Sequence, residues 1–165
     1  MRIGVLRETA SGERRVALVP DAVAKLGAAG HQIVVQRGAG EAAGFLDAAY
    51  EKAGATLAAD AAALCGGNPE IVVKVRKPSS AEAALLPKGS TLVALLTPGS
   101  NDDLLTALKE RGLTALALEL VPRISRAQSM DVLSSQSGVA GYKAVLVGAS
   151  ALDKFLPMLT TAAGS

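Results

Sequence analysis

Apolar runs alternate with amphipathic segments along most of the chain, and this alternation predicts strands followed by helices. The runs of strand length are Arg2–Leu6, His31–Gln36, Ile71–Val75, Ser90–Leu96 and Leu113–Leu120. They are rich in Val, Ile and Leu instead of alternating with polar residues, which is typical of strands buried on both faces of a parallel sheet. We therefore expect Leu113–Leu120, like the others, to be a buried strand.

Segments with helical spacing separate these runs. They are Asp21–Ala29, Asp47–Ala53, Ala58–Cys65, Ser80–Leu85 and Asp102–Arg111. Because strands and helices alternate, we predict an α/β fold: an open parallel sheet with helices on both faces, Rossmann-like or flavodoxin-like. We assign residues 1–122 to this domain.

A polar stretch, Val121–Gln136 (VPRISRAQSMDVLSSQ), follows the last apolar run. Pro122 ends the strand because its ring removes a ladder donor. A polar cluster at the end of such a strand usually faces the crevice where open α/β sheets bind ligands. The alternative is an ordinary helix start with solvated charges.

A long helix is expected from about Gln128 towards Leu156, with Ser125 or Ser129 as its cap and Asp131 in its first turn. One face would be apolar, and the other would carry small and hydrogen-bonding residues. We treat residues 123–165 as a loop and connecting helix.

Composition narrows the possible functions. Hydrophobic residues make up 50% of the chain and charged residues 19%, which suits a folded core. A net charge of +2 and 2% aromatic residues give no indication of nucleic-acid binding. The single cysteine, Cys65, excludes an internal disulfide and a cysteine-based zinc site, and we expect no metal. The N-terminus does not resemble a signal peptide, and no apolar run reaches the ~20 residues that a membrane helix needs.

The Val121–Gln136 stretch closely resembles a loop of the NAD(H)-binding alpha subunit of proton-translocating NAD(P) transhydrogenase. Other segments resemble the N-terminal half of the same subunit, and the related alanine dehydrogenases share them: RIGVLRE, ERRVALVP, QRGAG, IVVKV and FLPMLTTAAG. The resemblance implies hydride transfer between NAD(H) and NADP(H), coupled to proton translocation. Cofactors carry such chemistry, and the protein supplies orientation and water exclusion.

The resemblance also implies a cofactor site in the loop. Gln128 would contact the carboxamide, Asp131 and Ser134 would hold ribose or carboxamide groups, and Arg123 would set the nicotinamide ring. The implied cofactor-binding set is Arg123, Ile124, Ser125, Arg126, Gln128, Asp131 and Ser134, of which Arg123, Gln128 and Asp131 would be catalytic.

Partners follow from the same resemblance. We expect a homodimer that binds an NADP(H)-binding subunit and, through the complex, membrane-embedded subunits. The location would be cytoplasmic, peripheral to the inner (plasma) membrane. In the resembled subunit a glycine-rich NAD-binding Rossmann domain follows the segment FLPMLTTAAG. We therefore expect the chain to be a fragment that is inactive by itself and binds NADH weakly.

Two further motifs invite other interpretations. Gly38–Ala43 matches G-x-G-x-x-A, but it follows the second predicted strand and lacks the acidic residue about twenty positions on, so we interpret it as a structural turn. Arg15 and Lys74 match substrate-binding positions of alanine dehydrogenases. Thr97, however, stands where those enzymes place a catalytic histidine, and His31 opens a strand elsewhere.

The alternatives are therefore a fragment of an alanine dehydrogenase-like enzyme and a non-catalytic interaction domain. The missing histidine disfavours the first, because oxidising an amino acid needs a proton acceptor. We hypothesise that Arg15 and Lys74 are an inherited structural pair.

Overall fold

The computed structural model describes residues 1–154 and 156, in two compact units, Met1–Val121 and Pro122–Ser165. The segment FLPMLTTAAG therefore lies outside the described residues, apart from Leu156. The long helix expected towards Leu156 ends earlier, at Ala151, because the backbone of Leu152 is extended.

The first unit alternates strands and helices. Its strands are β1 (Arg2–Val5), β2 (Gln32–Gln36), β3 (Thr56–Ala58), β4 (Ile71–Arg76), β5 (Thr91–Leu95) and β6 (Thr114–Ala117). Its helices are α1 (Pro20–Ala28), α2 (Asp47–Lys52), α3 (Ala61–Gly66), α4 (Ser80–Leu85) and α5 (Asp102–Glu110). Short 3₁₀ helices lie at Glu41–Ala43, Pro98–Ser100 and Leu118–Leu120.

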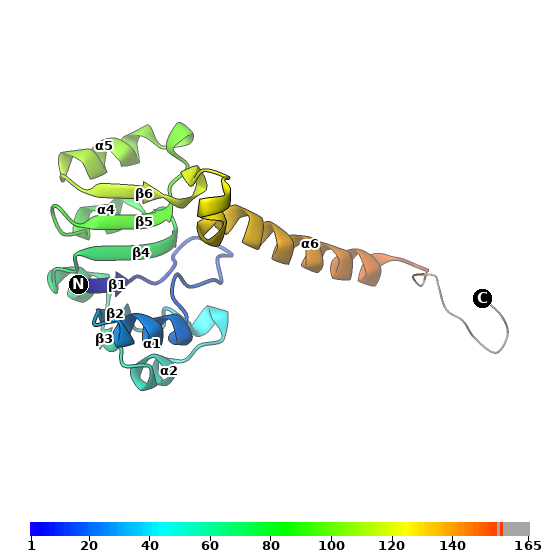
Figure 1. Ribbon diagram of the computed structural model, residues 1–165, viewed down its shortest axis with the longest axis horizontal. Coiled ribbons are helices and arrows are strands. Elements are labelled where there is room, and N and C mark those ends of the chain that lie inside the picture. The colour runs from blue at the N-terminus through cyan, green and yellow to red at the C-terminus, as the bar shows by residue number, and fades with distance from the viewer. Residues whose placement is uncertain (155, 157–165) are drawn as a thin grey trace. The chain divides into compact units, whose positions relative to one another are not determined.

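All the strands are parallel, in the order β3-β2-β1-β4-β5-β6 (Figure 1). The chain builds the sheet outward from β1 in one direction, then returns to the other side of β1 with β4. The predicted fold class is thus confirmed. In such sheets the crevice at the carboxyl ends of the two strands where the order reverses, here β1 and β4, is the usual ligand site.

One strand was missing from the sequence prediction. We expected a helix over Ala58–Cys65, but β3 occupies Thr56–Ala58 and pairs with β2, and α3 begins only at Ala61. Asp60 caps this helix, because its Oδ1 accepts the N–H of Ala63 at 2.7 Å. Three residues are too few for a pattern of alternation to show in the sequence.

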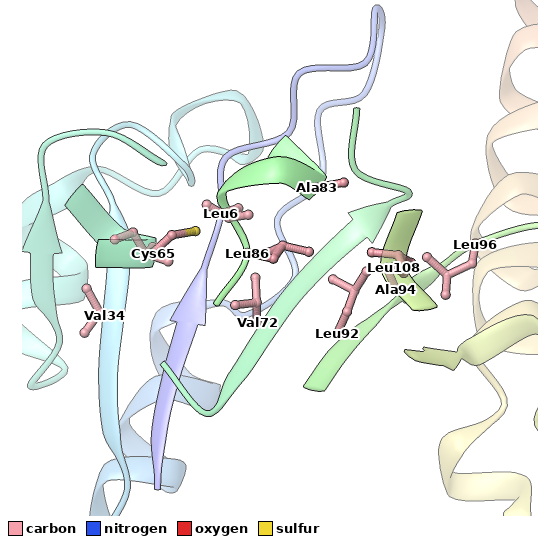
Figure 2. Close-up of a cluster of buried hydrophobic side chains, with 11 residues drawn as sticks. Leu6, Val34, Cys65, Val72, Ala83, Leu86, Leu92, Ala94, Leu96 and Leu108 are labelled. Atoms are coloured by element: carbon pink, nitrogen blue, oxygen red, sulfur yellow. The ribbon is translucent and has the colours of Figure 1, made fainter. Parts of the chain in front are cut away.

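The core lies in two layers because successive strand residues point to opposite faces of the sheet. One layer joins Val34, Val72 and Leu92 to apolar residues of α3, α4 and α5 (Figure 2). It includes Cys65, which is only 4% exposed. Burial raises the pKa of the Cys65 thiol, and the nearby Glu82 adds to this effect.

The opposite layer joins Ile3, Val5, Ile33 and Val35 to Val23 of α1 and Tyr50 of α2. Tyr50 is fully buried, and its hydroxyl donates a hydrogen bond of 3.0 Å to the Leu18 carbonyl. Both faces of the sheet therefore carry helices, as predicted.

The expectation of a fully buried Leu113–Leu120 strand was wrong. Only Thr114–Ala117 is a strand, and Leu118–Leu120 forms a 3₁₀ helix. β6 lies at the edge of the sheet, and Leu116 is 51% exposed. Leu116 lies on the face that α1 and α2 cover, but those helices pack over the β1–β3 half, so in the described residues β6 is bare on this side.

The second unit contains a 3₁₀ helix, Ser125–Met130, and α6, Val132–Ala151. Asp131, not Ser125 or Ser129, is the cap of α6, so the helix begins four residues later than expected from Gln128. The predicted apolar face is not buried in the described part of the chain: most side chains of α6 are exposed, including Val139, Val145 and Val147. No helix in the described part of the chain is long and apolar enough to cross a membrane.

Candidate functional site

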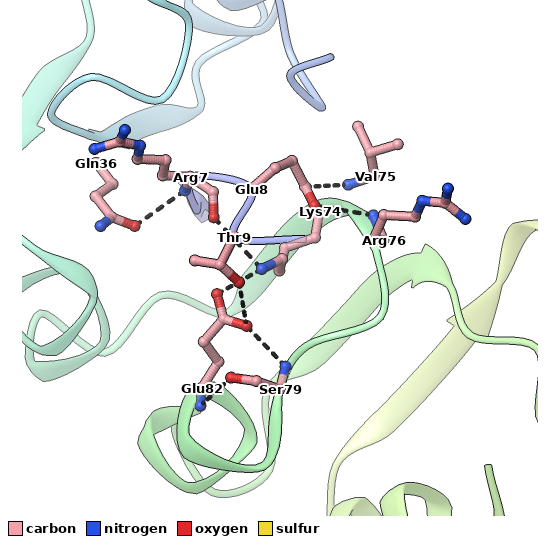
Figure 3. A network of polar contacts seen from close by, with 9 residues as sticks. All are labelled: Arg7, Glu8, Thr9, Gln36, Lys74, Val75, Arg76, Ser79 and Glu82. Atoms are coloured by element: carbon pink, nitrogen blue, oxygen red, sulfur yellow. Dashed lines mark hydrogen bonds and ion pairs between the residues drawn. The ribbon is translucent and has the colours of Figure 1, made fainter. Parts of the chain in front are cut away.

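Charged side chains fill the carboxyl ends of β1 and β4, the strands where the sheet order reverses (Figure 3). Glu8, just after β1, accepts the N–H of Val75 at 2.6 Å and of Arg76 at 3.2 Å. Burial raises the pKa of Glu8 and outweighs the two backbone hydrogen bonds and the nearby Lys74, which lower it. The segment after β1 is thus tied to the end of β4.

Lys74 of β4 is 2% exposed and forms an ion pair with Glu82 of α4. Its Nζ lies 2.5 Å from Glu82 Oε1 and also donates to the Arg7 carbonyl at 3.4 Å. Glu82 Oε2 accepts the N–H of Ser79 at 2.7 Å, which completes a capping box at the start of α4. The one lysine of the apolar strand is therefore already paired.

Arg15 and Arg76 share a second carboxylate, Glu13. Glu13 Oε2 lies 2.6 Å from Arg15 and 3.1 Å from Arg76. The hydrogen bond from the Arg15 side chain lowers the pKa of Glu13 to about 2, although burial alone would raise it. Arg15 and Lys74 thus each contact a carboxylate of the chain itself, in agreement with the hypothesis that both residues are structural. Arg14 instead donates to the Ala42 carbonyl at 3.3 Å.

A third polar group lies at the carboxyl end of β5. Thr97 has a left-handed backbone, with φ 49° and ψ 62°. The Oε1 atom of Glu119 accepts the N–H groups of Leu96 and Thr97, while Glu119 Oε2 is buried without a partner in the described part of the chain. Asn101, which caps α5 by position but makes no side-chain capping bond there, donates to the carbonyls of Leu96 and Thr97.

The carboxylates at these sites were not singled out from the sequence. For Glu82 a signal existed, since Ser79-x-x-Glu82 is a capping-box pattern ahead of a helix. Glu119 was visible as an acid inside an apolar run. Nothing in the local pattern pointed to the distant partners of Glu8 and Glu13.

Other residues of the chain occupy the space beside the glycines of the Gly38–Ala43 turn. The N–H of Gly38, whose φ is +70°, donates to Asp47 Oδ1 at 2.9 Å. A Cβ on Gly40 would lie 2.6 Å from Tyr50 Cε2 and 2.7 Å from the Phe45 carbonyl oxygen. Both glycines therefore have steric reasons to be glycine, in agreement with a structural turn.

His31 directly precedes β2, so it lies at the amino end of the strand, away from the carboxyl-end groups described above. Its Nδ1 is buried without a hydrogen-bond partner among the described residues. It also lines a pocket of about 650 Å³ with Arg2 and Lys52. Within the described residues, no group of His, Cys, Asp and Glu is arranged to hold a metal ion.

The residues predicted to contact nicotinamide all lie at the start of the second unit. Arg123, Ile124, Ser125, Arg126, Gln128 and Ser134 are exposed, and Asp131 is half-buried. Ala127 is buried, which anchors the middle of the loop. The crevice expected around these side chains stays a prediction.

Asp131 and Ser134 are brought together by the helix start. Asp131 Oδ1 accepts the Ser134 N–H at 2.9 Å, and Oδ2 accepts the Ser134 hydroxyl at 2.6 Å. The hydrogen bonds from Ser134 lower the pKa of Asp131, and Arg123 contributes electrostatically in the same direction. The group thus presents an ionised carboxylate, a hydroxyl and a guanidinium within one short stretch.

The fold and the carboxyl-end groups define a parallel α/β domain of Rossmann-like order. The chain belongs to the family described as alanine dehydrogenase/PNT, N-terminal domain, whose model matches residues 4–140. It is 47% identical over 164 residues to NAD(P) transhydrogenase subunit alpha of Cereibacter sphaeroides, covering 99% of this chain and 31% of that protein. It is 39% identical over 154 residues to alanine dehydrogenase of Bacillus subtilis, covering 93% of this chain and 39% of that enzyme.

Among solved structures, the transhydrogenase from Sinorhizobium meliloti superposes with a TM-score of 0.92 at 41% identity. The match covers 99% of this chain and 48% of that one. The chain thus spans about a third to a half of the length of these relatives.

Proposed function

We propose that this chain is the N-terminal part of the NAD(H)-binding subunit of a proton-translocating NAD(P) transhydrogenase. The observation that carries the proposal is the VPRISRAQSMDVLSSQ loop, whose polar side chains are gathered at the exposed start of α6. Higher identity to a transhydrogenase subunit than to an alanine dehydrogenase supports the same choice. The reaction would move a hydride between NAD(H) and NADP(H).

For hydride transfer between two nicotinamides, the main contribution of the protein is to orient the cofactors. When bound, the two nicotinamides supply donor and acceptor carbons, and no protein acid or base is needed for the hydride itself. Gln128 would donate to and accept from the carboxamide, for which a side-chain amide is suited. Asp131 and Ser134, already hydrogen-bonded to each other, would hold ribose or carboxamide groups. Arg123 would set the position of the ring, while Ile124, Ser125 and Arg126 would line the site.

The residues fit only the nicotinamide end of NAD(H). The exposed loop offers donors and acceptors, but the Gly38–Gly40 turn is filled by Asp47 and Tyr50 and leaves no cradle for a pyrophosphate. That group would be bound by an adjoining Rossmann domain. We further propose a homodimer, an NADP(H)-binding partner subunit and membrane-embedded subunits, with the chain on the cytoplasmic side of the membrane.

The alanine dehydrogenase alternative is disfavoured at Thr97 and Lys74. Thr97 offers no side chain that can take a proton near neutral pH, and Lys74 is held by Glu82 and the Arg7 carbonyl. Production of NADH that depends on an amino acid, by the complete protein, would overturn this choice.

The test is single-turnover hydride transfer by the complete subunit assembled with its NADP(H)-binding partner. Gln128→Asn and Asp131→Asn should each slow transfer by ~10-fold or more while changing the NADH Kd by less than about threefold, because small misplacements of a reacting group cost large factors in rate. Ser129→Ala, a change to an exposed loop residue without an assigned contact, is the matched control. Unchanged rates in both loop variants would remove the loop from the mechanism.

A further inference from the structure

At the start of α6, the side chains of Asp131 and Ser134 present only hydrogen-bond acceptors. Ser134 has one hydroxyl hydrogen, and this hydrogen is used in the bond of 2.6 Å to Asp131 Oδ2. The Ser134 N–H is used as well, in the bond of 2.9 Å to Asp131 Oδ1. Only oxygen lone pairs of the two side chains remain for a ligand, so a group bound here has to donate hydrogen bonds.

The pair also carries a negative charge. The hydrogen bonds from Ser134 lower the pKa of Asp131, so its carboxylate is ionised and has no proton to donate. Because Asp131 is the cap of α6, the charge also lies at the positive end of the helix dipole, which stabilises it. A carboxylate on a ligand would therefore meet a like charge here and find no donor in the pair.

Hydrogen-bond donors lie in the same short stretch of the second unit. Arg123 is near enough to Asp131 to lower its pKa electrostatically. The Gln128 carbonyl accepts the Asp131 N–H at 3.2 Å, which joins these two residues in one turn. A guanidinium only donates, and the side-chain amide of Gln128 can do both. Acceptors and donors in one stretch are the complement of a primary carboxamide, whose NH2 group donates and whose oxygen accepts.

We propose that Asp131, with the Ser134 hydroxyl bonded to it, makes the site selective for the carboxamide form of the cofactor. Its carboxylate accepts from the NH2 group of NAD(H) and rejects the acid analogue, nicotinic acid adenine dinucleotide, whose carboxylate has no hydrogen to donate and is repelled. The inference rests on the proposed function of the loop, and it narrows the role of Asp131 to the carboxamide. A site that is built to bind an N–H group discriminates against a ligand that lacks it.

The test measures the Kd of NADH and of the reduced acid analogue for the complete subunit, by calorimetry at low salt. Because Asp131 is only half-buried, solvent weakens the discrimination, and the unmodified subunit should prefer NADH by ~10-fold or more. Asp131→Asn keeps a helix cap but removes the charge, and should bring the two Kd values within about threefold of each other. The ratio compares two ligands on one protein, so a purely structural role of Asp131 would not change it.

Two controls show whether the charge is responsible. Ser129→Ala, a change at an exposed loop residue without an assigned contact, should keep the full preference. Raising the salt from about 0.02 M to about 0.5 M should reduce the preference of the unmodified subunit, because mobile ions screen exposed charges. The ratio for Asp131→Asn should hardly respond to salt. A preference that is independent of salt in the unmodified subunit would contradict like-charge repulsion.

Equal affinities for the two ligands in the unmodified subunit would mean that Asp131 holds the ribose, which both ligands share, and would overturn the proposal. A preference that persists in Asp131→Asn would overturn it too, because another residue would then be selective.

Hydride transfer separates this inference from the proposed function. The single-turnover rate of Asp131→Asn is measured in the subunit assembled with its NADP(H)-binding partner. A slow rate beside an unchanged preference would overturn the selectivity alone. An unchanged rate beside an unchanged preference would overturn the function assigned to the loop as well.

Discussion

Lys74 Nζ lies 2.5 Å from Glu82 Oε1, and the two side chains are 1% and 10% exposed. This contact explains how a lysine can stand inside the apolar strand β4. Burial alone would raise the pKa of Glu82, but the hydrogen bonds from Lys74 and the Ser79 N–H reverse the direction and lower it. Each charge is therefore tolerable only because the other is present.

Lys74→Met should destabilise the fold by ~3–5 kcal/mol, because it leaves the buried Glu82 carboxylate without its cation. Adding Glu82→Gln, which preserves the capping-box pattern, should recover part of the loss, so that the double variant is more stable than the sum of the single changes predicts by ~1–3 kcal/mol. Urea unfolding of the four proteins measures this coupling. Additive losses would mean that the pair is not coupled in solution.

Glu13 should make the fold sensitive to acid. Its folded pKa of about 2, set mainly by the Arg15 side chain, lies below the ~4.3 of an unfolded glutamate. A depressed acid pKa contributes stability that is fully present above the unfolded value and is lost as pH falls from there towards the folded value. Glu13→Gln should therefore have a lower Tm than the unmodified protein at pH 7, and the difference should shrink between about pH 4.5 and 2.

Glu51, exposed on α2, provides the control for this measurement. Glu51→Gln should leave the Tm profile with pH close to that of the unmodified protein. A Glu13→Gln profile parallel to the unmodified one down to pH 2 would contradict the ion pair with Arg15.

Gly40→Ala should destabilise the fold by ~1–3 kcal/mol or more, because the new Cβ would lie 2.6 Å from Tyr50 Cε2 and 2.7 Å from the Phe45 carbonyl oxygen. Gly27→Ala in α1 is the matched control: its Cβ meets nothing within 4 Å, and alanine should stabilise the helix by ~0.5–1 kcal/mol. Thermal unfolding compares the two. A stable Gly40→Ala protein that had lost NADH binding would instead favour a nucleotide-binding turn.

Substitutions can separate the observed role of Asp131 as the cap of α6 from its proposed role in holding NAD(H). Asn caps helices about as well as Asp, whereas Ala does not. Asp131→Asn should keep the start of α6 protected in hydrogen exchange at the Ser134 amide, and Asp131→Ala should expose it to exchange. Both should slow hydride transfer in the assembled enzyme. A normal rate in Asp131→Asn would reduce Asp131 to a helix cap.

Strand and helix types were accessible from the sequence because apolar runs and helical spacing are local. The order of the strands was not, since nothing in a run such as Ile71–Val75 states which strand lies beside it. β3 was not predicted because it is only three residues long. β6 was predicted to be a buried strand because an apolar run in the sequence does not show whether the strand lies in the middle or at the edge of the sheet.

In the candidate site, too, features that depend on local sequence could be predicted, and features that depend on tertiary packing could not. The positions of Lys74 and Thr97 could be singled out one residue at a time, as a cation in an apolar strand and as a substitution in a resembled motif. Their partners could not, because Glu82 and Glu119 reach them through tertiary packing. The helix start was misplaced because several serines and Asp131 could each cap it, and only backbone geometry selects Asp131.

The lone thiol has a practical consequence. Cys65 is sealed in the core and its pKa is raised, so maleimides and other thiol reagents should leave it untouched while the protein is folded. A Ser129→Cys protein, with the new thiol at an exposed position, can then carry a single fluorophore without prior replacement of Cys65. The same molecule reports its own unfolding, since Cys65 becomes reactive only when the layer between the sheet and α3 opens.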